Sequence, residues 1–141
     1  MKNIITIKCS FVGNGKVKGE ALVSQDMFAF GGTPDLETGI VKEPNHSLLG
    51  KDITGKILIY PTGKGSTGDP YSCYFLWKAG HAPAAIINRT ANPTTVVSSI
   101  LSGIPMAHNC DKDPVSVIED GDWVELDSDE GQLIITKKEA V

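Results

Sequence analysis

The stretch Lys56–Pro70 (KILIYPTGKGSTGDP) decides the fold of this chain. Its first five residues form an apolar run, which predicts a buried strand. Asp69-Pro70 is a common way to begin a helix, because a carboxylate caps free N–H groups and proline has the φ of a first turn. Between strand and helix, the glycine-rich turn Gly63–Gly68 directs backbone N–H groups at one spot that suits an anion. The same glycines would also serve a tight turn that binds nothing.

The residues after this turn continue the alternation of helix and strand. A helix is predicted over about 70–79, with Cys73, Leu76 and Trp77 on one face and Gly80 at its end. Trp77 is expected to pack in the core from that face.

A second strand, a second helix and a third strand then follow. The strand is predicted at 84–87, the helix runs from Asn92-Pro93 to Gly103, and the last strand spans 104–107. The apolar residues of the second helix are Val96, Val97, Ile100 and Leu101. This βαβαβ order predicts parallel strands joined by crossover helices.

The two ends of the chain have the pattern of antiparallel strands. Residues 1–8 alternate like a strand, and a turn at 13–15 leads to a second strand over 17–23. A hairpin is predicted from 123–126 and 132–135 around the turn 128–131. The expected architecture is one α/β domain over residues 1–141, with a central parallel βαβαβ unit flanked by antiparallel strands.

Residues 25–55 show neither the period of a helix nor that of a strand. Phe28-Ala29-Phe30 has the composition of a short strand, which Gly31–Asp35 would end. So long a loop in a compact domain is usually functional.

Composition excludes several classes of protein. A net charge of −4 without a basic stripe argues against nucleic-acid binding. No apolar run reaches the roughly 18 residues of a membrane helix, and the N-terminus has no signal-peptide block, so a cytoplasmic protein is expected. Three cysteines without C-x-x-C spacing predict no disulfide framework; Cys9, Cys73 and Cys110 are interpreted as buried small side chains rather than cluster ligands.

Two nucleotide-binding motifs come close to the glycine-rich turn without fitting it. Gly63–Gly68 matches G-x-G-x-x-G, but the acid that should bind a ribose is replaced by Asn88. The P-loop pattern needs Lys-Ser/Thr where this chain has Asp69-Pro70. An acid would repel phosphate there and Pro70 has no N–H to donate, so nucleotide binding is disfavoured.

Several segments in order resemble the swivel domain, or small subunit, of the aconitase X family. They cover nearly the whole chain: GEALVS (19–24), GGTPDLETG (31–39), GKILIYP (55–61) leading into GKGS (63–66), APAAIIN (82–88) and GIP (103–105). The resemblance implies a swivelling β/β/α fold. It also implies a hydro-lyase whose large subunit carries a [4Fe-4S] cluster, with no cofactor bound by this chain alone.

The resemblance also implies a substrate and a base. Free-standing small subunits of the family act in the dehydration of (R)-5-phosphomevalonate to trans-anhydromevalonate 5-phosphate, in the archaeal-type mevalonate pathway of isoprenoid biosynthesis. Fused relatives dehydrate hydroxyproline, which is the alternative substrate. The family's serine base corresponds to Ser66. Its alkoxide would need the loop N–H groups, the positive end of the following helix and the nearby Lys64 for stabilisation.

Other residues are candidates of lower rank. Substrate-binding roles are expected for Gly63, Lys64, Gly65 and Thr67 in the loop and for Gly31 and Gly32 at its mouth, with Asp35 and Thr62 beside them. Arg89 is a possible anion clamp or a solvated surface residue. The separated His46, His81 and His108 predict no metal site. The acidic stretch from Asp111 to Asp122 is interpreted as a solvated loop that lacks a calcium motif.

Three functional classes follow, and a substitution separates them. A hydro-lyase subunit would lose turnover on Ser66→Ala, whereas a stand-alone anion-binding module would lose little. In a purely structural or regulatory subunit, the whole glycine-rich loop would be expendable. The full-length resemblance favours the hydro-lyase subunit.

Overall fold

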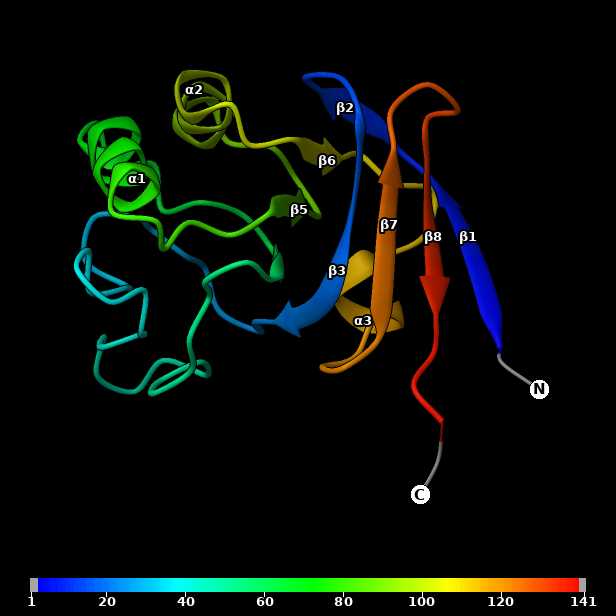
Figure 1. Cartoon of the computed structure of the whole chain (residues 1–141), viewed down its shortest axis with the longest axis horizontal. Helices are drawn as coiled ribbons and strands as arrows, with labels where there is room; N and C mark the ends of the chain where they lie inside the picture. The colour runs from blue at the N-terminus through cyan, green and yellow to red at the C-terminus, as the bar shows by residue number, and fades with distance from the viewer. Residues whose placement is uncertain (1–2, 140–141) are drawn as a thin grey trace.

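The computed structural model describes residues 3–139 and has eight strands and three helices (Figure 1). Met1 and Lys2 of the predicted first strand lie outside the described residues. In chain order the elements are β1 (Ile4–Lys8), β2 (Ser10–Val12), β3 (Lys16–Val23), β4 (Ile57–Tyr60), α1 (Asp69–Lys78), β5 (Ala85–Asn88), α2 (Pro93–Ser102), β6 (Met106–His108), α3 (Pro114–Val117), β7 (Trp123–Asp127) and β8 (Gln132–Thr136).

The predicted α/β architecture is confirmed. The strands follow the order β1-β8-β7-β3-β4-β5-β6-β2 in a single sheet. β3, β4, β5 and β6 are parallel, with Leu22 opposite Leu58 and Ile86 opposite Met106. β1, β8, β7 and β3 are antiparallel, and the predicted hairpin is β7–β8. The helices α1 and α2 connect the parallel strands, as the βαβαβ pattern indicates.

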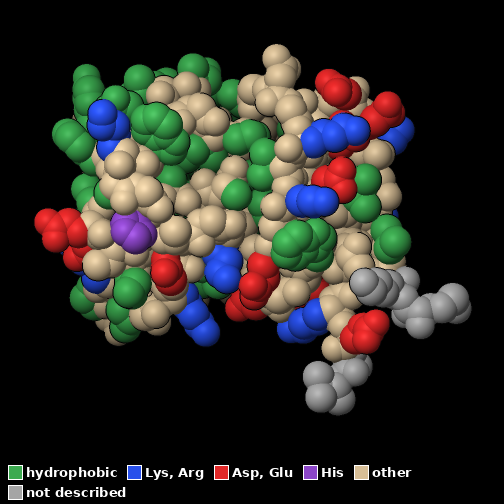
Figure 2. Space-filling view, viewed as in Figure 1, with side chains coloured by type: hydrophobic (Ala, Val, Ile, Leu, Met, Phe, Trp, Pro, Cys, Tyr) green, Lys and Arg blue, Asp and Glu red, His purple; other side chains and the backbone are tan. Residues whose placement is uncertain are grey.

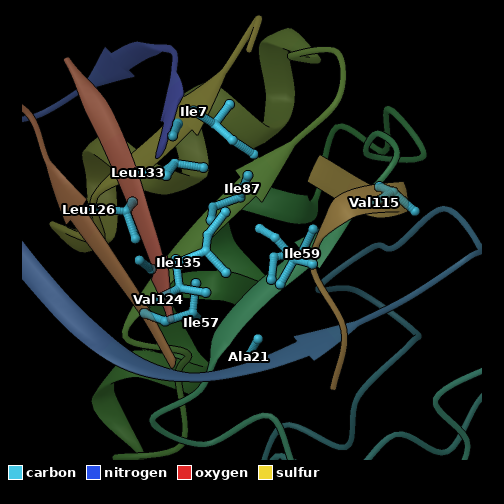
Figure 3. Packing of buried hydrophobic residues seen from close by; sticks show 13 residues of the cluster. Ile7, Ala21, Ile57, Ile59, Ile87, Val115, Val124, Leu126, Leu133 and Ile135 are labelled. Atoms are coloured by element: carbon cyan, nitrogen blue, oxygen red, sulfur yellow. The ribbon is translucent and has the colours of Figure 1, made fainter. Parts of the chain in front are cut away.

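The central parallel strands β4 and β5 are buried on both faces, which gives the molecule three layers. Ile57 and Ile59 of β4 face the antiparallel half of the sheet, where they pack with Val124 and Ile135 (Figure 3). The alternate residue Leu58 faces the opposite way and packs with the helices and the 25–55 loop. The layers are therefore β, β and α, as the resemblance implies, and the fully apolar run ILIY reflects burial on two sides.

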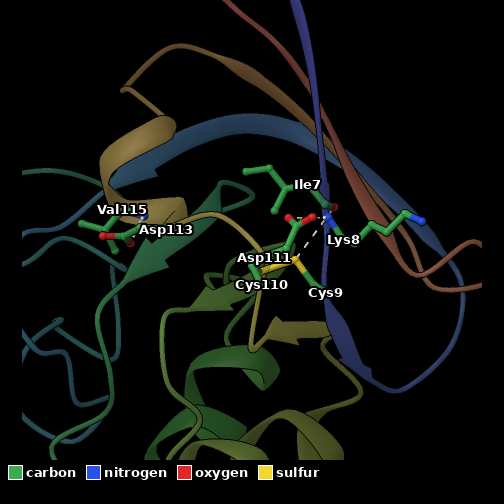
Figure 4. Close-up of a disulfide and its surroundings, with 7 residues drawn as sticks. All are labelled: Ile7, Lys8, Cys9, Cys110, Asp111, Asp113 and Val115. Carbon is green, nitrogen blue, oxygen red and sulfur yellow. Dashed lines mark hydrogen bonds between the residues drawn. A yellow bond between two sulfur atoms is a disulfide. The ribbon is translucent and has the colours of Figure 1, made fainter.

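The expectation of three unpaired cysteines is wrong for two of them. Cys9 and Cys110 form a disulfide across 101 residues of sequence, with Cα atoms 4.0 Å apart (Figure 4). Cys9 lies between β1 and β2, and Cys110 follows β6, which pairs with β2. Lys8 N donates to Asp111 Oδ1 beside the bond. Sheet pairing thus brings together two cysteines that sequence spacing does not connect, while Cys73 is buried as expected.

α1 differs from its predicted packing at Trp77, and α2 buries small polar side chains instead of its large apolar ones. Trp77 is 48% exposed instead of buried in the core, although Cys73 and Leu76 are fully buried. α2 buries its small polar residues Thr95, Ser98, Ser99 and Ser102 and exposes Val97, Ile100 and Leu101. Small side chains allow α2 to lie close to α1, so its larger apolar residues are on the outside.

Two further expectations are corrected by the backbone. Phe28–Phe30 is not a strand: Phe28 forms an isolated parallel bridge with Gly63. Asp69 is not the N-cap of α1, because Gly68 has that position and Asp69 is the first helical residue. Asn92 does cap α2, since its side chain accepts a hydrogen bond from Thr94 N at 3.0 Å.

The acidic stretch is bonded to the fold rather than being a solvated loop. Asp120 accepts a hydrogen bond from Val23 N at 2.7 Å. Asp122 is fully buried and contacts Lys137 Nζ at 2.5 Å. Burial alone would raise the pKa of Asp122, but bonds from Lys137, Lys138 N and Glu119 N outweigh it and lower that pKa. This carboxylate therefore holds the segment after β8 to the turn before β7.

Replacing Asp122 by alanine is expected to lower the free energy of unfolding by about 3 kcal/mol, because Lys137 loses its buried partner. Since the folded-state pKa of Asp122 is lowered, this contribution is present above about pH 4 and is lost as the pH falls below that value. Urea unfolding of both proteins between pH 3 and pH 7 measures it. Asp129→Ala, at an exposed site, is the control; equal losses for the two variants would contradict the assignment.

Candidate functional site

The glycine-rich loop Gly63–Gly68 lies where β4 ends and α1 begins, at the carboxyl edge of the parallel strands. Lys64 to Gly68 are all exposed. Within the described part of the chain, the amides of Gly65 to Gly68 donate to no protein acceptor. Gly65 has a φ of 81°, a conformation that favours glycine. The loop therefore combines a positive-φ turn with the free N–H donors.

The N-terminus of α2 supports the loop from beneath. A side-chain carbon at Gly63 would overlap Thr95 Oγ1, and one at Gly65 would lie 3.3 Å from Asn92 Nδ2. These two glycines therefore allow the loop backbone to approach the first turn of α2. As a result, the N-terminal ends of both α1 and α2 adjoin the loop, and both helix dipoles favour negative charge there.

The segment containing Gly31 and Gly32 lies against the same loop. Phe28 N donates to Thr62 O at 3.3 Å, and Lys64 N donates to Phe28 O at 3.2 Å. Gly31 N donates to the carboxylate of Asp69 at the start of α1, so the exposed Gly31-Gly32 turn lies beside the loop, of which Lys64 to Thr67 are exposed and Gly63 is buried. Ser66 is exposed within the loop, two residues before the N-cap of α1.

The buried carboxylate of Asp69 joins the parts of this site. It accepts hydrogen bonds from Phe30 N at 2.5 Å and from Ser98 Oγ of α2 at 3.0 Å, and it is only 4% exposed. Burial raises the pKa of Asp69, against the opposing effect of bonds from Ser98, Phe30 and Gly31. One side chain therefore fixes the Phe30-Gly31 turn and α2 to the first residue of α1.

Lys64 is ion-paired rather than freely solvated. Its Nζ lies 2.7 Å from Glu43 Oε1, and Thr33 Oγ1 donates to the same oxygen at 2.7 Å. Hydrogen bonds from Lys64 and Thr33 lower the pKa of Glu43. Glu43 belongs to the 25–55 segment, so this cluster connects that long loop to the glycine-rich loop.

Other candidates from the sequence are engaged elsewhere. Asp35 accepts from Glu37 N in its own turn, and Arg89 forms a bidentate pair with Asp113 at 2.9 and 3.1 Å. His46 is buried and its Nε2 lies 2.9 Å from Met27 O. Among residues 3–139, no group of three or more His, Cys, Asp or Glu side chains is placed to hold a metal ion.

Three supporting residues were not identified from the sequence as part of the site. Glu43 and Thr95 meet the loop only through tertiary packing, and no local motif marks them. Asp69 stands in the motif, but its position after Gly68 gives it a role in packing instead of capping.

Two buried atoms nearby, Tyr60 Oη and Asn88 Oδ1, have no hydrogen-bond partner in the described structure. Burial raises the pKa of Tyr60.

Comparison with known proteins places this geometry in a family. The family model described as the aconitase X swivel domain matches residues 6–135. The chain belongs to the aconitase X swivel-domain family. The fold class and the family expected from the sequence are thereby confirmed.

Individual relatives extend the similarity. The chain is 43% identical over 133 residues to the phosphomevalonate dehydratase small subunit of Methanosarcina acetivorans, covering 94% of this chain and 92% of the relative. It is 46% identical over 125 residues to the protein of the same name from Methanocella arvoryzae, covering 89% and 95%. A crystal structure of Thermococcus kodakaraensis aconitase X in its holo-form matches with a TM-score of 0.87 and 39% identity, over 93% of this chain and 98% of that one.

Across the described residues of this aconitase X swivel domain, no helix combines the length and apolar character needed to span a bilayer.

Asp69→Asn is expected to lower the free energy of unfolding by about 1–3 kcal/mol, because an amide cannot accept all the bonds that the carboxylate accepts. Amide hydrogen exchange at Phe30 and Gly31 should accelerate in the same variant. The control is Asp35→Asn, since asparagine supports the same local turn. Unchanged exchange at Phe30 and Gly31 would show that Asp69 does not hold the turn.

Proposed function

We propose that this chain is the small subunit of a two-chain hydro-lyase that dehydrates (R)-5-phosphomevalonate to trans-anhydromevalonate 5-phosphate. The observation that carries the proposal is the exposed Ser66 among free amides at the start of α1, in a chain of the aconitase X swivel family. The relatives named phosphomevalonate dehydratase small subunits favour this substrate over hydroxyproline.

Ser66 is assigned the role of base. Dehydration beside a carboxylate removes a weakly acidic C–H proton while the hydroxyl departs, so one water is lost and a C=C bond forms. A serine accepts that proton only as an alkoxide, which needs strong stabilisation. The free amides of the loop and the positive end of α1 supply it. Exposure of Ser66 leaves room for a substrate held by another chain.

Of the two roles expected for Lys64 from the sequence, substrate binding is favoured here over stabilisation of the Ser66 alkoxide. Because Glu43 already pairs with Lys64, the net charge of the pair is zero and little positive charge remains for the Ser66 alkoxide. We assign Lys64 to the anionic end of the substrate. It would exchange its partner Glu43 for a phosphate or carboxylate oxygen, while the amides of Gly65 and Thr67 and the turn at Gly31 and Gly32 complete the binding surface.

The remaining half of the site is assigned to a large subunit. The described residues offer no ligand set for an iron–sulfur cluster: Cys9 and Cys110 are joined to each other, and Cys73 is buried beside Ser102. We therefore place the [4Fe-4S] cluster of the family on the partner, where it would serve as a Lewis acid toward the departing hydroxyl. This chain contributes the base and part of the substrate surface.

Ser66→Ala should reduce kcat by at least ~1000-fold in the assembled complex, because no other described side chain on the loop replaces the base. The measurement is 5-phosphomevalonate dehydration under anaerobic conditions. Ser10→Ala, an exposed serine on β2, is the control and should keep wild-type turnover. A Ser66→Ala complex with near-wild-type kcat would remove Ser66 from the mechanism and favour an anion-binding module.

Glu43→Gln should lower KM for 5-phosphomevalonate several-fold with little change in kcat, because Lys64 is released from its ion pair. Lys64→Gln should raise KM, because the cation that binds the anionic end of the substrate is lost. Steady-state kinetics of the two complexes tests both. An unchanged KM in both variants would place Lys64 outside the substrate site.

A further inference from the structure

The outer face of α1 and α2 is apolar and unpartnered. Figure 2 shows hydrophobic side chains gathered over these two helices at the upper left of the view. The large side chains on this face are between 48% and 69% exposed: Tyr71, Phe75 and Trp77 on α1, with Val97, Ile100 and Leu101 on α2. We call this set the helical face.

Charge is almost absent from the helical face. α2 contains no charged residue, and the only exposed charged residue of α1 is Lys78 at its C-terminal end. Tyr74 stacks on Trp77 with ring centroids 5.8 Å apart, so the aromatic side chains form an ordered surface. Aromatic enrichment and depletion of charge characterise the cores of protein interfaces.

The helical face is continuous with the Ser66 loop. Tyr71 lies in the first turn of α1, three residues after Gly68. At the other end, a groove of about 250 Å³ lined by Val12, Ile100, Ile104 and Pro105 continues the apolar surface beyond α2. Anything that covers the helical face therefore also reaches the edge of the loop.

We propose that the helical face is the surface on which the large subunit docks. This inference rests on the proposed function, which requires a second chain over the Ser66 loop. Three aromatics of about 200 Å² each, a little more than half exposed, present roughly 350 Å². With the three aliphatic residues, the groove and the loop edge, the surface approaches the roughly 800 Å² per partner of a stable interface.

The test is assembly of the full chain with its tagged, cluster-loaded large subunit, measured by calorimetry. Ile100→Asp and Phe75→Asp should each weaken binding at least ~30-fold, as expected for central interface residues. Ile4→Asp is the matched control, because Ile4 on β1 is 61% exposed and Ile100 is 65% exposed. It should bind as the wild type does. Thermal unfolding of each free variant verifies that the fold is kept.

The outcomes separate the docking surface from the proposed function. Wild-type affinity of both helical-face variants would overturn the docking surface, even if the complex dehydrates phosphomevalonate. The wild-type chain could instead be a dimer when free. If these variants are then monomers and still bind the large subunit, the helical face binds a second copy of this chain and the docking proposal is overturned. If only the helical-face variants fail to bind the large subunit, and the wild-type complex does not dehydrate phosphomevalonate, the docking surface stands and the proposed substrate is rejected.

Discussion

The buried carboxylate of Asp69 is the constraint on which the candidate site depends. Three segments distant in sequence meet at this group: the first residue of α1, the Phe30-Gly31 turn of the long loop, and Ser98 of α2. Burying a carboxylate is costly unless hydrogen bonds compensate it. Its raised pKa reflects that cost. Because α1 begins at the end of the glycine-rich loop, and both α2 and the segment at Phe28 contact that loop, the geometry that holds Asp69 also sets the position of the reactive loop.

The parallel core could be predicted because its signals are local. The apolar run ILIY, the Asn92-Pro93 start and the Gly103 stop each specify an element boundary, and all three are confirmed within a residue or two. Local patterns also identified the loop that contains Ser66. They did not identify Glu43 or Thr95, because these residues reach the loop only after residues 25–55 and α2 have packed.

The errors share a physical cause. Cys9 and Cys110 come together because β2 pairs with β6, and Asp122 meets Lys137 because β7 pairs with β8. The first pairing joins strands distant in sequence, whereas the second is the predicted hairpin, in which no local pattern marks Asp122 as a buried partner of Lys137. The spacing of Cys73, Leu76 and Trp77 on one helical face predicts that Trp77 packs in the core. Yet α1 and α2 contact each other through Cys73, Ser98 and Ser102, and these small residues leave the larger ones outside. An exposed Trp77 is thus informative about partners rather than about the core.

The two hydrophobic cores lie on opposite sides of the parallel strands, and Ser66 is exposed on the side of the helices. The disulfide and the antiparallel half enclose one core, while the helices and the long loop enclose the other and present Ser66 at its surface. Nothing in this arrangement shields Ser66 from water within the described chain, since Lys64 to Gly68 are exposed. Water must be excluded for an alkoxide to be stabilised strongly by fixed dipoles. The second chain in our account therefore closes the site as well as adding chemistry.

Proton exchange tests the central claim most directly. The assembled complex is incubated with 5-phosphomevalonate in D₂O, and NMR follows deuterium entering the carbon beside the carboxylate. With Ser66 as the base, the wild-type complex incorporates deuterium and the Ser66→Ala complex, although it still binds substrate, incorporates none. Deuterium uptake at the wild-type rate in the Ser66→Ala complex would show that another group removes the proton.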